Sequence, residues 1–227
     1  MKPITWQHAL GALGLGLLVW GSAQALLVAP PDRHMGDVSR IISIHVPCAW
    51  VGLLVYTIAM VLAVGSLWSG RSRWDAALTA AIETGLVLTA LMLLTGMLFA
   101  RPTWGVWWTW DVRLTTTLLA FVLFAGVLTM RSFLEEPRRR ATWTAVATII
   151  AWVDVPLVYF CVRWMRSIHQ VQSSPDTIDA AIYWPMRINA FAVLFLALWF
   201  IVLRTRVERL REEVDEVAPP APVVTAA

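Results

Sequence analysis

Residues 104 to 111 read Trp104-Gly105-Val106-Trp107-Trp108-Thr109-Trp110-Asp111 and hold four tryptophans and a carboxylate. On a helical projection Trp104, Trp107, Trp108 and Asp111 are spaced i, i+3, i+4 and i+7, which predicts that they share one face. That face would be a flat indole surface with a carboxylate at its edge. An aromatic belt at a membrane interface is the plainer interpretation. Four tryptophans in one loop are more than a belt needs, so we favour a docking surface for a large planar apolar ligand.

The histidines are the side chains best suited to bind a metal held in such a ligand, because neutral imidazole is a common iron ligand. The chain has four, at His8, His34, His45 and His169. Which of them can reach the tryptophans depends on the elements that carry them.

Composition indicates the class of protein. The 227 residues are 59% hydrophobic with a mean hydropathy of +0.67, which predicts a polytopic membrane protein in the lipid bilayer. The net charge of +3 is small and dispersed, so we expect no nucleic-acid partner. Cys48 and Cys161 form no CxxC pair or metal cluster, and each lies in an apolar stretch typical of a small buried side chain. A disulfide between them remains an alternative.

Six apolar stretches are long enough to cross a membrane, so the predicted fold is all-α with six transmembrane helices and a tryptophan-rich outer loop at about 101–113. They cover about residues 6–29, 41–68, 76–100, 114–130, 142–162 and 186–203. Residues 1–206 then form one six-span domain, and 207–227 form a charged, then Pro/Ala-rich cytoplasmic tail. Ala23-Gln24-Ala25 resembles a signal-peptidase site, so a cleaved signal is an alternative for the first stretch. We interpret it as a helix, since the apolar run exceeds a typical signal core.

The basic residues predict the orientation, because cytoplasmic loops are enriched in Lys and Arg. With the N-terminus inside, eleven basic residues lie inside and seven outside. The loops at about 30–40, 101–113 and 163–185 are then outside, in the periplasm if the host has two membranes. His8 falls on the inner side, whereas His34, His45 and His169 share the side of the tryptophans. His45 has the best position, at an apolar helix start where a ligand can lie partly out of water.

The stretch Trp104-Gly105-x-Trp107-Trp108-x-Trp110-Asp111, continuing into Arg113-Leu114-Thr115, resembles the WWD signature of membrane haem-handling proteins. Within that superfamily the chain most resembles the haem exporter protein C family of cytochrome c maturation. The motif is long and compositionally rare, and the spacing of the apolar runs extends the likeness over most of the chain. The resemblance implies noncovalently bound haem b as the cofactor. Family members ligate haem through one histidine before the second span and one in the last outer loop, which correspond to His45 and His169.

Haem propionates need cationic partners. Arg101 and Arg113 flank the tryptophans and are the favoured candidates, although interfacial snorkelling also explains them. The role of Asp111 is less obvious, because a carboxylate beside propionates repels them. Asp111 could instead cap the N-terminus of the fourth span or hold an arginine in place, and a direct ligand role also remains open. The predicted haem-binding set is Trp104, Gly105, Trp107, Trp108, Trp110, Asp111, Arg101 and Arg113, with His45 and His169 as iron ligands.

These features favour a protein that binds haem at the outer surface of a bacterial inner membrane and passes it on. No nucleophile–base constellation or phosphate loop occurs in the sequence, so we expect no enzyme, and any ATPase must be a separate subunit. The resemblance implies three partners: the ATPase and membrane subunits of an ABC transporter, a small single-span subunit, and a membrane-anchored periplasmic haem chaperone. Two alternatives are a b-type haem electron carrier and the haem-attaching synthetase of the same superfamily.

Two carboxylates fall within predicted spans, where charge is costly and often functional. They are Glu83 and Asp154. Asp154 precedes Pro156 by two residues, so we expect its carboxylate to satisfy backbone groups released at a proline kink. We predict no proton path from either residue.

Overall fold

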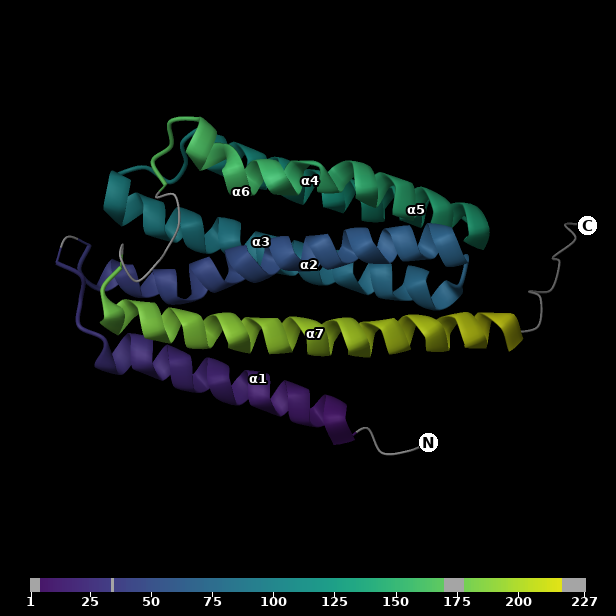
Figure 1. The fold of residues 1–227 in the computed structure, drawn as a ribbon, viewed down its shortest axis with the longest axis horizontal. Helices are drawn as coiled ribbons and strands as arrows, with labels where there is room; N and C mark the ends of the chain where they lie inside the picture. Colours follow the sequence, from purple (N-terminus) through teal and green to yellow (C-terminus); the bar gives the residue numbers. More distant parts are fainter. Residues whose placement is uncertain (1–4, 34, 170–177, 218–227) are drawn as a thin grey trace, which may run out of the picture.

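The structure is a computed structural model that describes residues 5–33, 35–169 and 178–217. His34 and the tail beyond residue 217 lie outside these ranges, so the predictions for them are not addressed. The described chain is helical without a strand (Figure 1). Its elements are α1 (Thr5–Ala23), the π-helical turn η1 (Gln24–Val28), the 3-10 turn η2 (Asp37–Ile41), α2 (Ile42–Ser69), α3 (Ser72–Trp104), α4 (Val112–Ser132), α5 (Pro137–Trp152), α6 (Asp154–Trp164) and α7 (Ala180–Val217).

Six helical segments are long and apolar enough to cross a membrane, which confirms the predicted fold class. They are Trp6–Val28, Asp37–Ser69, Ser72–Trp104, Val112–Ser132, Pro137–Trp164 and Ala180–Arg211. Helix α7 starts before the predicted span, at Ala180, and continues as a charged helical extension to Val217. The expected boundary between residues 206 and 207 therefore falls inside one helix.

The antiparallel pair α2 and α3 forms the centre of the bundle, with α4 to α6 on one side and α7 and α1 on the other (Figure 1). Gly70 adopts a left-handed conformation, φ 61°, and lets the chain reverse between α2 and α3. In the core Tyr56 stacks on Phe124 of α4, with ring centroids 3.7 Å apart. Gly85 of α3 permits this packing, since a Cβ there would lie 2.4 Å from Tyr56 Cε1.

The first span packs as a member of the bundle, along α7. Gly11 and Gly14 provide the close approach, because Cβ atoms there would lie 2.6 Å from Trp199 and 2.9 Å from Leu196. The end of this span is also fixed, since Arg40 donates to the carbonyls of Ala25 at 2.6 Å and Leu26 at 2.7 Å.

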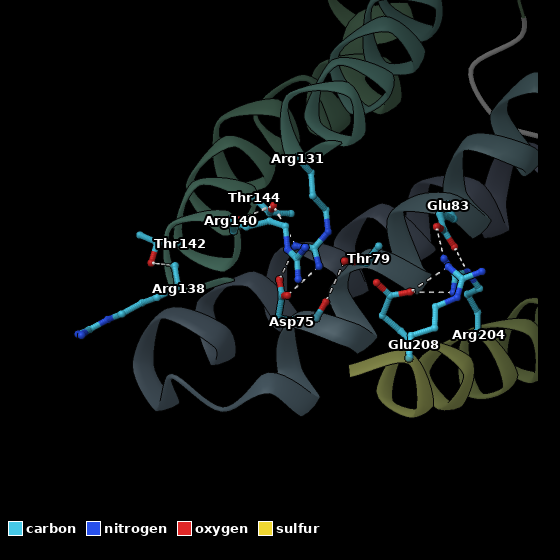
Figure 2. A network of polar contacts seen from close by, with 11 residues as sticks. Asp75, Thr79, Glu83, Arg131, Arg138, Arg140, Thr142, Thr144, Arg204 and Glu208 are labelled. Carbon is cyan, nitrogen blue, oxygen red and sulfur yellow. Dashed lines mark hydrogen bonds and ion pairs between the residues drawn. The ribbon is translucent and has the colours of Figure 1, made fainter. Parts of the chain in front are cut away.

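Ion pairs join α3 to α4 and to α7 (Figure 2). Arg131 of α4 makes a bidentate pair with Asp75 of α3, at 2.9 and 2.8 Å, and also donates to Thr144 of α5. Arg204 of α7 pairs with Glu83 of α3 at 2.7 and 3.0 Å. Glu83 is therefore a structural partner of α7 and not an isolated charge in the membrane.

The fifth span breaks at Val153 into α5 and α6, as the proline at position 156 predicts. The expectation that Asp154 would satisfy the released backbone groups was wrong. Both of its carboxylate oxygens are buried without a hydrogen-bond partner in the described part of the chain. Cys48 and Cys161 are both buried free thiols, so the alternative of a disulfide does not hold.

Candidate functional site

The described parts of the three loops predicted to share one side of the membrane lie at one end of the bundle, beside the starts of α2, α4 and α7 (Figure 1). His8 lies at the other end, since its neighbour Gln7 accepts a hydrogen bond from Arg206 near the end of α7. The helix directions alone therefore separate His8 from His45 and His169.

His45 lies on the first turn of α2 and faces α3. Its Nδ1 is 3.0 Å from Thr95 Oγ1. Gly96, the next residue of α3, gives the imidazole its room, because a Cβ there would lie 3.1 Å from His45 Cε1. The ring is thus held between a hydroxyl and a glycine of the neighbouring helix.

His169 follows α6 and is held by Asp111, the residue that begins α4. Its Nδ1 is 3.1 Å from Asp111 Oδ1. The same carboxylate accepts from the Ile168 N–H at 3.0 Å, from Ser167 Oγ at 3.1 Å and from the Arg113 N–H at 3.0 Å. The last contact confirms that Asp111 caps α4. One carboxylate therefore links the start of α4 to the loop that carries His169.

The charges of this pair follow from its surroundings. Burial raises the pKa of Asp111, but the hydrogen bonds from Ile168, Ser167 and Arg113 outweigh it, so the pKa lies below 3.8. Burial lowers the pKa of His169 below 6.5, against the opposite effect of Asp111. A neutral imidazole beside an ionised carboxylate is the usual arrangement of a metal-ligating histidine.

Both histidines line one cavity of about 350 Å³ between α2, α3, α4 and α6. This volume lies at the lower end of the range for small-molecule and cofactor sites. Most of the lining is apolar or aromatic, and it includes Trp50, Met92, Phe99, Trp104 and Tyr159. Arg113 provides the cation on the wall. The cavity therefore offers two imidazoles, an apolar interior and one guanidinium, which is the donor set that haem requires.

The tryptophans do not form the single face that the helical projection predicts. Helix α3 ends at Trp104, because Gly105 adopts a left-handed conformation, φ 79°, and residues 106–111 are not helical. Trp104 alone of the four lines the cavity, with its ring 5.8 Å from that of His169. Trp108 packs edge-on against Trp110, whereas Trp107 and Trp110 are exposed.

Of the two predicted propionate partners, Arg101 and Arg113, one lines the cavity and one does not. Arg113 lines the cavity, whereas Arg101 is exposed and its guanidinium donates to the carbonyl of Gly105 at the end of α3. In this structure Arg101 therefore stabilises the turn that starts the tryptophan loop. Of the two candidates for a propionate partner, Arg113 has the better position.

Sequence reasoning missed the wall that α3 contributes to the site. Thr95, Gly96 and Phe99 all contact or surround His45 or the cavity. A hydroxyl in an apolar span is a weak signal, and it does not single out Thr95, because Thr79, Thr84 and Thr89 occur in the same helix. Only the packing of α2 on α3 distinguishes Thr95 from them.

The fold and the cavity define an α-helical multi-pass membrane protein with a histidine-lined site at one end of its bundle. Comparison with known proteins is more specific: residues 3–218 match the family described as Heme exporter protein C. The chain belongs to this family, whose role is in haem export and cytochrome c maturation.

The alignments with individual relatives cover most of the chain. It is 33% identical to the heme exporter protein C of Bradyrhizobium diazoefficiens over 216 residues, 92% of this chain and 81% of the relative. It is 32% identical to that of Haemophilus influenzae, over 94% of this chain and 86% of the relative. A putative cytochrome c biosynthesis ccmC-like mitochondrial protein of Marchantia polymorpha is 31% identical, over 87% of this chain and 82% of the relative.

Proposed function

We propose that this protein binds haem b at the periplasmic face of the inner membrane and delivers it to a membrane-anchored haem chaperone. His45 and His169 ligate the iron, Arg113 neutralises a propionate, and Trp104 contacts the porphyrin. One observation carries the proposal: two histidines 124 positions apart line the same apolar cavity, each with its Nδ1 held by a side chain from another helix or loop.

The exposed tryptophans have a separate role in this proposal. Trp107 and Trp110 lie outside the cavity, at the end of the bundle where the site opens. Aromatic side chains provide rigid contact area at interfaces. Trp107, Trp108, Trp110 and Gly105 then form the surface on which the chaperone docks, while Arg101 holds the turn at its base. Membership of the exporter family supports an ABC-type complex with ATPase, membrane and small single-span subunits as the setting.

Haem ligation is tested with purified His45→Ala, His169→Ala and double-substituted protein. Each single variant should change the Soret band, and the double variant should lose most bound haem, because both histidines that line the cavity are then removed. His8→Ala is the control, since it lies at the opposite end of the bundle, and its spectrum should equal the wild type. A wild-type spectrum in the double variant would remove these histidines from the site.

Delivery is tested in the same preparations by measuring haem that arrives on the chaperone. The double variant Trp107→Ala/Trp110→Ala should keep its bound haem yet load the chaperone poorly, because the docking surface is lost while the cavity is intact. Trp184→Ala is a matched control, since Trp184 is likewise exposed and outside the cavity but belongs to α7 and not to the tryptophan loop. Normal loading by the tryptophan variant would reduce the loop to a membrane-interface anchor.

A further inference from the structure

The imidazole of His45 has two nitrogens, and iron can bind only one that carries no proton. Which nitrogen is free depends on what the other one contacts. Nδ1 lies 3.0 Å from Thr95 Oγ1, so the direction of this hydrogen bond decides the tautomer.

The hydroxyl of Thr95 has a single proton, and two carbonyls compete for it. Oγ1 is 2.6 Å from the carbonyl oxygen of Leu91 and 3.2 Å from that of Met92. Neither carbonyl can donate, so turning the proton toward His45 would leave oxygen lone pairs facing each other at 2.6 Å. The proton therefore goes to Leu91, and Oγ1 accepts from His45 Nδ1–H.

With Nδ1 protonated, Nε2 is the nitrogen with a free lone pair. His45 is thus prepared for iron before any haem arrives.

Gly96 sets the position of the same ring. A Cβ at this residue would lie 3.1 Å from His45 Cε1 and 3.7 Å from Nδ1. An alanine at this position would require the imidazole to shift by a few tenths of an ångström, and a shift away from α3 lengthens its bond to Thr95. The Thr95 hydroxyl and the missing side chain of Gly96 therefore both determine the position of the His45 ring, from adjacent residues of α3.

We infer that Thr95 and Gly96 are positioning residues that fix His45 as the Nδ1–H tautomer and direct Nε2 to haem iron. The inference rests on the proposed haem site and adds α3 to it. It also gives the two proposed iron ligands hydrogen bonds of unequal strength, since His169 donates to a carboxylate and His45 donates to a neutral hydroxyl.

The tautomer is measured without haem, by nitrogen-15 NMR of histidine-labelled protein, with the His45 signals assigned by difference from His45→Ala. Wild type should show a protonated Nδ1 and a bare Nε2 at His45. In Thr95→Val this pattern should weaken, because the acceptor is lost, and Thr95→Ser should restore it. A wild-type His45 with its proton on Nε2 would overturn the inference, whether or not any variant folds.

Haem titration followed at the Soret band provides the second measurement. Loss of a partner that orients a metal ligand typically weakens binding about 10- to 100-fold, so we expect at least a tenfold loss in Thr95→Val and Gly96→Ala. Thr84→Val is the matched control for the threonine, because Thr84 makes the same bond to the carbonyl four residues back on α3, at 2.8 Å, without a histidine partner. Gly126→Ala is the control for the glycine, since a Cβ there meets no atom within 4 Å.

The outcomes separate this inference from the proposed function. If His45→Ala binds haem like the wild type, the proposed site itself is wrong. If His45→Ala loses haem while Thr95→Val and Gly96→Ala bind it like their controls, the site stands and only the positioning role fails.

Discussion

Asp111 joins two elements that are distant in the sequence. Its carboxylate caps α4 and accepts from Ser167, Ile168 and His169 in the loop after α6. An aspartate suits this role because both oxygens only accept, so all the donors can be satisfied together. The aspartate of the tryptophan motif therefore acts on the histidine, at the edge of the cavity and not inside it.

We predict that Asp111→Asn weakens haem binding by at least about tenfold, because an amide nitrogen replaces one acceptor and the orientation of His169 is lost. The measurement is a haem titration at the Soret band. Ser167→Ala is the comparison with a smaller expected effect. It removes the hydroxyl that donates to Asp111 and accepts from the His169 backbone N–H, but it leaves the carboxylate on the His169 ring. Equal affinity of Asp111→Asn and wild type would show that the loop positions His169 without the carboxylate.

At the scale of elements, the buried pair of Asp75 and Arg131 fastens α4 to α3, and the added bond to Thr144 includes α5 (Figure 2). Asp75 is 4% and Arg131 7% exposed. Removal of one partner leaves an uncompensated buried charge, which is far more costly than removal of both.

We therefore predict that Asp75→Val and Arg131→Met each destabilise the protein by about 3–5 kcal/mol, whereas the double variant loses much less than the sum. Unfolding in detergent micelles, analysed as a double-mutant cycle, measures this coupling. Arg139→Met is the control, because its ion pair with Glu136 is exposed and 3.8 Å long. Additive effects of the two buried substitutions would mean that the pair contributes no coupling.

At the scale of the whole molecule, the antiparallel helices bring the described parts of the three loops of the site to one end of the bundle (Figure 1). The bias of basic residues predicts that the end with the site is periplasmic. The proposed function requires this orientation, because the proposed periplasmic chaperone could reach the cavity only from that side.

We predict that single cysteines replacing Asp37, Val106 and Arg166 react with a membrane-impermeant thiol reagent in intact cells, and that cysteines replacing Ser69 and Glu135 do not. All five positions are exposed, so access depends on the side of the membrane and not on burial. The background carries alanine at the buried Cys48 and Cys161. Labelling of Ser69→Cys, or protection of Val106→Cys, would contradict the predicted orientation.

The sequence alone determined the class of protein and the end of the helix bundle at which the candidate site forms. Apolar runs of membrane-spanning length set the six spans, because the bilayer imposes both their length and their composition. Once the spans are counted, their alternating direction assigns His45, His169 and the tryptophans to one end and His8 to the other. The motif from Trp104 to Asp111 also indicated the family, which the comparisons confirmed.

Only the tertiary structure decided which side chains meet. The helical projection of the tryptophans failed because one left-handed glycine, Gly105, ends α3 before Trp107. The contact of Asp111 with His169 joins residues 58 apart in sequence, and that of His45 with Thr95 joins residues 50 apart. Periodicity describes which face of one helix is apolar, but the partner of that face depends on how two helices cross. The contacts of His45 with Thr95 and Gly96 therefore form only when α2 packs against α3.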